Sequence, residues 1–246
     1  MTQTIMVIHG MRHGKLNQRL SDFVNELMSK HQRTIHLSFL ESDTQHLERV
    51  VKDLIQEGHQ SFQIIPLLLF SAQHYCDDIP SILNNIKQTY PQIEYRIAQP
   101  LATHNNMADI MIDHITHVLK RTVQVDRIVF IGHGSSVYDM PDIELNQLMQ
   151  ACDVFDKPMH MMMVYGDYQY QKLLQPFLLM NENILIVPVF LYDGFLANKV
   201  KHEIAHMPSS SKVHYSSAIN FDPKLSKIIE DRIQEIEVLH NVSYST

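Results

Sequence analysis

The stretch IMVIHGMRHGK, residues 5–15, joins a short apolar run to two His-Gly pairs that stand four residues apart. The apolar run is typical of a buried β-strand, and the glycine that follows it permits a tight turn into a helix. Strand–turn–helix units of this kind build α/β folds with parallel sheets. The chemistry of the segment is therefore expected where the strand ends, with His9 and His13 as the two candidates.

Strand-like and helix-like stretches alternate along the rest of the chain. In the first half, three further strands are predicted at residues 34–40, 62–70 and 94–98. Four helices are predicted at residues 15–29, 45–58, 79–90 and 107–121. The series then restarts with DRIVFIGHGSS, residues 126–136, and four further strand–helix units follow. Because strands alternate with helices, we predict parallel sheets with helices on both faces and ligands beyond the carboxyl ends of the strands.

The restart indicates an internal duplication. His9 and His133 are 124 residues apart, Glu41 and Gly166 are 125 apart, and Pro66 and Pro188 are 122 apart. Near-constant spacing of this kind is the mark of a repeat. The predicted fold is therefore α/β with two similar domains, each a four-stranded parallel sheet flanked by helices. We place the first domain, with the functional site, at residues 1–123, and a degenerate repeat that closes the cleft at residues 124–246.

Composition excludes several classes of function. The 246 residues include 27 acidic and 20 basic side chains, and this net charge of -7 argues against a binder of nucleic-acid backbones. No apolar run reaches the roughly 18 residues that cross a bilayer, and no basic leader precedes the first apolar run, so we expect a cytoplasmic protein without a membrane partner. The two cysteines, Cys76 and Cys152, lack metal-site spacing and are expected to be reduced thiols.

Three polar residues follow the first three predicted strands: His9, Glu41 and His74. They are separated by 32 and 33 residues, close to the length of one βα unit, so they should return to the same edge of the sheet. Two imidazoles and a carboxylate suit a divalent transition metal and leave coordination positions open. Neutral imidazole can also accept a proton near neutral pH. The predicted site is therefore both metal-binding and basic.

Anion binding is expected beside this site. Gly10 lets the backbone approach a ligand at the start of the following helix, where the helix dipole favours negative charge. Arg12 and Lys15 add cationic side chains to the same turn, although each could equally be a solvated surface residue.

The segment PLLLFSAQHYCDDIP, residues 66–80, is the most distinctive of the chain, and we read its Asp-Asp pair as a helix cap before Pro80. With HGMR at 9–12 and FLE at 39–41, it resembles the class II tetrapyrrole chelatases, particularly the sirohydrochlorin chelatases that insert iron or cobalt. The resemblance implies that His9 and His74 bind the incoming metal and help to deprotonate the macrocycle. It implies that Glu41 is a further ligand or a proton acceptor.

The same resemblance implies a carboxylate-rich tetrapyrrole as partner and no tightly bound cofactor. Implied substrate contacts are Gly10, Arg12, Lys15, His133 and Ser135. The absence of a histidine-rich tail favours Fe²⁺ and a siroheme product, with Co²⁺ or Ni²⁺ as alternative metals. A duplicated chain could supply internally the cleft that shorter relatives form by dimerising, which favours a monomer.

The chain departs from the family pattern at Met11, where serine is usual, and in its second half. There Gly166 stands opposite Glu41 and Leu196 opposite His74, so we expect one working site rather than two.

Two other functions remain open from the sequence. MRHGKLNQ, residues 11–18, also resembles the Arg-His-Gly signature of histidine phosphatases, in which His13 would be the nucleophile and Arg12 a phosphate clamp. That interpretation leaves the 66–80 segment and the duplication unexplained, and the strand runs into His9 rather than His13. A noncatalytic metal or tetrapyrrole carrier would use the same residues without turnover.

Overall fold

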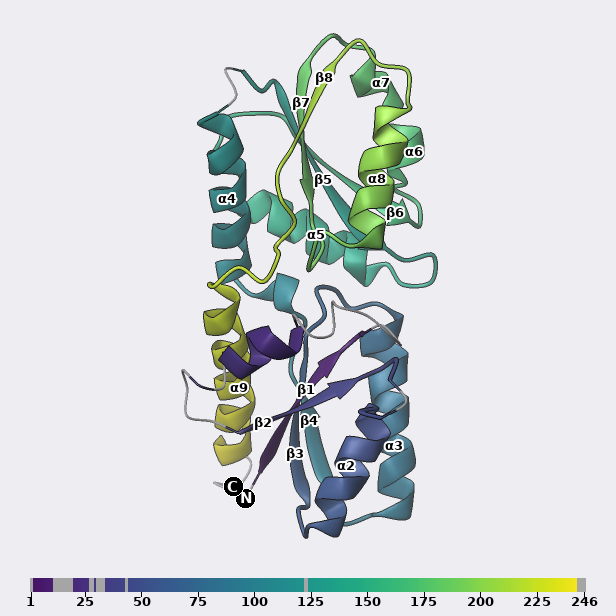
Figure 1. The fold of residues 1–246 in the computed structure, drawn as a ribbon, viewed down its shortest axis with the longest axis vertical. Helices are drawn as coiled ribbons and strands as arrows, with labels where there is room; N and C mark the ends of the chain where they lie inside the picture. Colours follow the sequence, from purple (N-terminus) through teal and green to yellow (C-terminus); the bar gives the residue numbers. More distant parts are fainter. Residues whose placement is uncertain are drawn as a thin grey trace. The chain divides into compact units, whose positions relative to one another are not determined.

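The computed structural model describes residues 2–10, 20–26, 29, 34–42, 44–121 and 124–242 (Figure 1). The predicted substrate contacts Arg12 and Lys15, and the alternative nucleophile His13, lie outside the described residues. Among the described residues, no helix has both the length and the apolar character needed to cross a membrane.

The first sheet has four parallel strands in the order β2-β1-β3-β4. Its strands are β1 (Gln3–Ile8), β2 (Ile35–Phe39), β3 (Ser61–Pro66) and β4 (Glu94–Ile97). Helices α2 (Leu47–Gln56) and α3 (Ile79–Thr89) lie on one side of this sheet (Figure 1). In the central strands β1 and β3 every residue after the first is buried, because helices cover both faces of a parallel sheet.

The second sheet repeats this topology in the order β6-β5-β7-β8. Its strands are β5 (Arg127–Gly134), β6 (Met159–Tyr165), β7 (Asn183–Pro188) and β8 (Lys212–Tyr215). Its helices are α5 (Met140–Ala151), α6 (Tyr170–Leu173), α7 (Gln175–Leu178) and α8 (Phe195–Ala205). The MHMMMVY run is strand β6, and its buried end packs in the core.

Strand register confirms the duplication residue by residue. Ile5 faces His36 in the first sheet, and Val129 faces His160 in the second, each 124 positions later. Val7 faces Pro66, and Ile131 faces Pro188, with spacings of 124 and 122. The predicted fold class, two four-stranded parallel α/β sheets of similar design, is confirmed.

The compact units do not follow the predicted boundary at residues 123 and 124. Unit 1 contains 1–68, 73–101 and 226–246, and unit 2 contains 69–72 and 102–225. Helix α4 (Asn106–Leu119) therefore belongs with the second sheet, and helix α9 (Leu225–Val242) belongs with the first. Each half keeps its own strands but takes a covering helix from the other half. The closing role of the second half stays a prediction.

Two contacts join these helices to the units they belong with. The Cys152 thiol at the end of α5 lies 3.8 Å from the carbonyl oxygen of Ala108 in α4. Arg232 of α9 is buried and donates to the carbonyl oxygen of Pro100, which follows β4, at 2.9 Å. Cys152 is a free thiol, and burial raises its pKa to about 12, so this thiol is inert.

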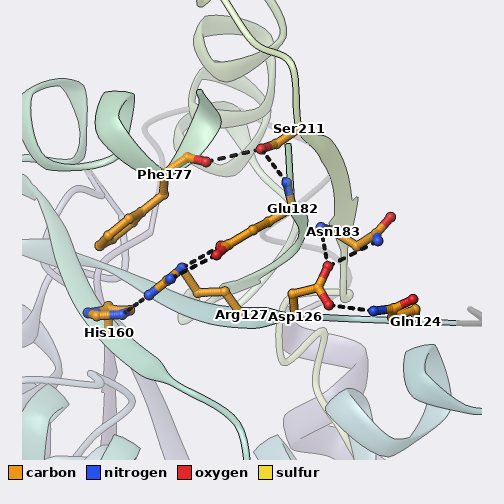
Figure 2. A network of polar contacts seen from close by, with 8 residues as sticks. All are labelled: Gln124, Asp126, Arg127, His160, Phe177, Glu182, Asn183 and Ser211. Carbon is orange, nitrogen blue, oxygen red and sulfur yellow. Dashed lines mark hydrogen bonds and ion pairs between the residues drawn. The ribbon is translucent and has the colours of Figure 1, made fainter. Parts of the chain in front are cut away.

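A polar network joins the amino ends of β5, β6 and β7 in unit 2 (Figure 2). Arg127 donates to both carboxylate oxygens of Glu182, at 2.8 and 3.1 Å, and to His160 Nε2 at 2.5 Å. The guanidinium also stacks 4.2 Å above the ring centroid of Phe177. Because its charge is paired and its donors are used, Arg127 can be mostly buried there.

Candidate metal centre

His9 follows the last residue of β1 and is oriented by its own turn. Its Nδ1–H donates to the carbonyl oxygen of Gly10 at 2.8 Å, which leaves the Nε2 lone pair directed elsewhere. Gly10 has a φ of +74°, and a Cβ there would stand 2.8 Å from Cδ1 of Phe39. Glycine is therefore required for the turn that presents His9, which supports the predicted importance of Gly10 without testing any contact with substrate.

Glu41 is brought beside His9 by an extension of the β1–β2 pairing. Leu40 N donates to Ile8 O at 2.9 Å, and Glu41 N donates to His9 O at 3.2 Å. The Glu41 carboxylate then lies with Oε1 3.9 Å from His9 Nε2. The backbone thus fixes this pair before either side chain meets a ligand.

His74 begins a single π-helical turn, His74–Asp78, that leads into α3. Its Nδ1–H donates to Asp78 Oδ2 at 2.6 Å, so the carboxylate orients the ring and leaves Nε2 free to accept. The Asp-Asp pair was predicted to cap the helix before Pro80, but Asp78 makes no side-chain cap hydrogen bond. The helical turn continues through Asp78, whose side chain caps no backbone amide and is used on His74 instead. Such π-helical turns are frequent at functional sites.

The three predicted ligands converge in unit 1. The rings of His9 and His74 meet edge to face with centroids 4.4 Å apart. Two atoms that each lie about 2.1 Å from one metal ion can be at most about 4.2 Å apart, so the separation of His9 Nε2 from Glu41 Oε1 is compatible with a shared ion. All three side chains remain partly exposed, with 44% for His9, 46% for Glu41 and 34% for His74.

The arrangement is open rather than closed. His9 pairs with Glu41 on one side and with His74 on the other, and no group of three His, Cys, Asp or Glu within the described ranges is ready-made to hold a metal ion. An open set of this kind suits an ion that must be released, whereas structural metal sites are closed.

A cavity of about 370 Å³ lies beside His74 in unit 1. It is lined by Leu40, Glu41, His46, His74, Asp78, Ser81, Ile82 and Asn85. A larger cavity of about 630 Å³ lies in unit 2 between α4 and β8, and shares no residue with the predicted site. Size alone therefore does not identify the reactive region, and the smaller cavity is the one next to the candidate ligands.

The second His-Gly turn has the same backbone but different neighbours. His133 Nδ1 donates to Gly134 O at 2.8 Å, and Gly134 has a φ of +69°. The ring of Tyr165 lies 5.1 Å from that of His133. The predicted contact Ser135 uses its hydroxyl to accept from two backbone amides of its own turn, at 3.1 Å each.

Strand register corrects one pairing made from the sequence. Gly134 pairs with Tyr165, so the 124-residue spacing places Tyr165, not Gly166, in the position of Glu41. The loop after β6 is one residue shorter than the loop after β2, since the bridges that close them join Met163 to Gln169 and Phe39 to His46. Leu196, opposite His74, packs against the core of unit 2. Both candidate ligands are thus absent from the second turn.

Sequence reasoning missed Asp78 and His46. The signal for Asp78 was its four-residue spacing from His74, which places both side chains on one helical face. His46 follows the Glu41 segment and accepts from the Glu48 amide at 3.3 Å, as the residue before α2. Histidine is uncommon in that capping role, so no local pattern identified it.

Comparisons with known proteins identify a family and several relatives of the chain. The CbiX family model matches residues 3–118 and 127–236. The chain is 25% identical to the sirohydrochlorin ferrochelatase of Bacillus subtilis (strain 168) over 253 residues, covering 96% of this chain and 92% of the relative. It is 20% identical to a sirohydrochlorin cobaltochelatase of Priestia megaterium, covering 96% and 80%. The structure of SirB from Bacillus subtilis with Fe³⁺ superposes with a TM-score of 0.82 at 21% identity, over 95% of this chain and 94% of the other.

Proposed function

The chain belongs to the CbiX family, and on that premise we propose that it is a sirohydrochlorin chelatase that inserts Fe²⁺ into the macrocycle to give siroheme. The observation that carries the proposal is the convergence of His9 with both Glu41 and His74. The relatives include ferrochelatases and a cobaltochelatase of similar coverage, so Co²⁺ is the alternative metal.

In this mechanism His9 and His74 hold the metal substrate through Nε2. Both rings donate Nδ1–H to a fixed acceptor, the carbonyl oxygen of Gly10 or the carboxylate of Asp78, so both Nε2 atoms keep a lone pair. Imidazole ligands and open coordination positions suit Fe²⁺ and Co²⁺ alike. The ion is then shared until the macrocycle nitrogens replace the protein ligands.

Metal insertion also releases the pyrrole N–H protons. When the ion leaves an imidazole for the macrocycle, the freed Nε2 lone pair can accept one of these protons. Glu41 beside His9, and Asp78 beside His74, are placed to stabilise the imidazolium that forms. One nitrogen atom thus serves first as ligand and then as base, and the protons pass to solvent at a partly exposed site.

We also propose roles for residues outside the metal centre. Arg12 and Lys15 follow the His9 turn and would meet substrate carboxylates, together with His133 and Ser135 of the second half. We expect a monomer, because the duplicated chain carries both sheets. The cytoplasmic location expected from the sequence stays a prediction.

The test is an anaerobic absorbance assay of sirohydrochlorin with Fe²⁺ and, in parallel, Co²⁺, using catalytic amounts of protein. Multiple turnovers that exceed the uncatalysed rate support a chelatase, and a higher kcat/KM with Fe²⁺ supports the iron assignment. Stoichiometric binding without turnover would instead support a carrier. Hydrolysis of a generic phosphate ester that depends on His13 would support the phosphatase and contradict the proposal.

A further inference from the structure

The loop that leads to His74 is held by a buried carboxylate from the second half of the sequence. Glu144 of α5 accepts from the Ser71 amide at 2.8 Å and from the Ser71 hydroxyl at 2.6 Å, one bond on each oxygen. Both residues are buried, and both lie in unit 2, because the chain passes through that unit at residues 69–72 before it returns to unit 1. His74 follows Ser71 by three residues.

The two residues before Ser71 are also fixed within unit 2. The carbonyl oxygen of Leu69 accepts from the Ala102 amide at 3.0 Å. Phe70 is buried, and its Cε2 lies 3.5 Å from the position that a Cβ on Gly132 of β5 would take. Residues 69–71 thus each have a different partner, and the carboxylate is the last one before the His74 turn begins.

The corresponding loop of the second half is fixed at the same position by a different side chain. The 122-residue spacing between Pro66 and Pro188 places Asp193 opposite Ser71. Asp193 N donates to Asn220 Oδ1 at 2.8 Å, the same length as the bond from the Ser71 amide. In both halves, therefore, a side-chain oxygen holds the main chain at this point of the loop.

Glu144 is not part of the repeat. Strands β4 and β8 begin at residues 94 and 212, so Ala102 stands opposite Asn220 and has no side-chain acceptor to offer. The counterpart of Glu144 at the 124-residue spacing is Leu20. The first half thus takes from α5 the acceptor that the second half has after β8.

A buried carboxylate is a costly acceptor. Among the described residues, Glu144 makes no ion pair and no hydrogen bond other than the two from Ser71. Burial raises the pKa of Glu144, and the two bonds from Ser71 oppose that rise. Removing the carboxylate would leave a buried amide and hydroxyl without this acceptor. A glutamine could meet both groups without a buried charge, because its side chain both accepts and donates.

We propose that Glu144 is a positioning residue for the metal centre, because it fixes the backbone of Ser71 and thereby sets where the His74 turn begins. Asp78 orients the ring of His74, and Glu144 places the main chain that carries that ring. The second half then supports metal binding without providing a ligand. The inference rests on the proposed chelatase function and concerns the hold on the metal substrate, not on the tetrapyrrole.

The experiment is a Co²⁺ titration of Glu144→Ala without tetrapyrrole, followed by the visible absorbance of bound Co²⁺, with His74→Leu as the blank. We expect the Kd for Co²⁺ to rise about tenfold, comparable to the loss of outer partners in metal sites. In steady-state metallation the apparent KM for Co²⁺ should rise by the same factor, with the KM for sirohydrochlorin unchanged. Glu144→Gln should recover most of the affinity, because it can accept from the Ser71 amide and donate to the hydroxyl.

The matched control is Asn220→Gly, which removes the acceptor of the Asp193 amide from the loop that leads to Leu196 instead of His74. Asn220 has a φ of +49°, a conformation that glycine adopts freely, so the change adds no backbone strain. Thermal unfolding measures the stability of both variants. Asn220→Gly should leave the Kd for Co²⁺ unchanged.

Ser71→Ala removes only the hydroxyl bond, should raise the Kd for Co²⁺ by a smaller factor, and replaces Glu144→Ala if that variant does not fold. Lower melting temperatures with an unchanged Kd for Co²⁺ would show a structural role alone and overturn the inference. An equal loss of affinity in Asn220→Gly, or no recovery in Glu144→Gln, would overturn it as well. Absence of turnover in the unmodified protein would instead overturn the proposed function.

Discussion

The two His-Gly turns have the same backbone conformation, but different side chains contact their histidines. In both, the imidazole Nδ1 donates to the next carbonyl oxygen at 2.8 Å, and the glycine has a φ near +70°. His9 then meets a carboxylate and a second imidazole, whereas His133 meets the ring of Tyr165. Both copies keep the turn that orients a histidine, and among the described residues His9 alone of the two contacts a carboxylate and a second imidazole, the partners that the proposed metal site needs.

At the opposite edge of each sheet, where the strands begin, the second half has the stronger polar contact. At the amino ends, Gln3 and Arg127 occupy equivalent positions 124 residues apart, and each contacts a histidine of the neighbouring strand, His36 or His160. The second copy has the stronger contact, an arginine held by Glu182 (Figure 2). The candidate ligands of unit 1 thus lie at its carboxyl edge, and the arginine-centred network of unit 2 lies at its amino edge.

The largest effect is expected from His74→Leu, which removes a difference between the two halves. It gives the first half the residue that the second half has at Leu196. We expect turnover to fall by about 10²- to 10⁴-fold, because the change removes a ligand and a proton acceptor together. Circular dichroism should show an unchanged fold, since His74 is partly exposed. Turnover within a few-fold of the original would mean that His74 is not part of the site.

The next largest effect concerns the orientation of His74. Asp78→Ala removes the acceptor at 2.6 Å and should lower kcat/KM for the metal by about 10- to 100-fold, as loss of such partners does in metal sites. Asp78→Asn retains an oxygen that can accept from Nδ1–H and should recover part of that loss. The same measurements on Asp77→Asn, at the exposed neighbouring position, give the control. Equal activity of the alanine and asparagine variants would argue against orientation by this bond.

The two turns can also be compared by stability. A Cβ at Gly134 would stand 2.2 Å from the backbone oxygen of Tyr165, whereas at Gly10 the nearest atom belongs to the side chain of Phe39. A backbone atom yields less than a ring, so Gly134→Ala should destabilise more than Gly10→Ala. Gly58→Ala has a similar positive φ and open space, and isolates the backbone strain of about 1–3 kcal/mol. Thermal unfolding should rank the losses as Gly134, Gly10, Gly58, and the reverse order would contradict the geometry.

The smallest expected effect is on stability in mild acid. Burial, and then the Arg127 charge, lower the pKa of His160, so the folded state binds the proton less readily than the unfolded chain does. Stability is therefore complete above the ordinary value of 6.5 and is lost as the pH falls below it toward the folded pKa. His160→Gln should flatten the fall in melting temperature between about pH 6.5 and 5. An unchanged slope would show that other groups control it.

How much the sequence could predict follows from these same residues. His9 and Glu41, which closely follow β1 and β2, and His74, which begins the helical turn after β3, were predictable because a βα unit has a nearly fixed length and returns to one edge of the sheet. The exchange of α4 and α9 was not predictable, since an apolar stripe shows that a helix is covered but not by which sheet.

Two local errors have different causes. The Asp-Asp-Ile-Pro run has the composition of a helix start, and only the three-dimensional turn shows Asp78 bonded to His74. Tyr165 was missed as the counterpart of Glu41 because the loop after β6 is one residue shorter, a shift that only the hydrogen-bond register reveals.

The central claim is that one of two equivalent turns is the working site, and the matched pair His9→Ala and His133→Ala tests it most directly. Both variants remove an imidazole held by the same bond at 2.8 Å. Sirohydrochlorin metallation with Fe²⁺ is measured for both under identical conditions. The account predicts that His9→Ala loses at least about 10²-fold in turnover and that His133→Ala stays within about tenfold of the original. Equal losses, or a greater loss in His133→Ala, would contradict it.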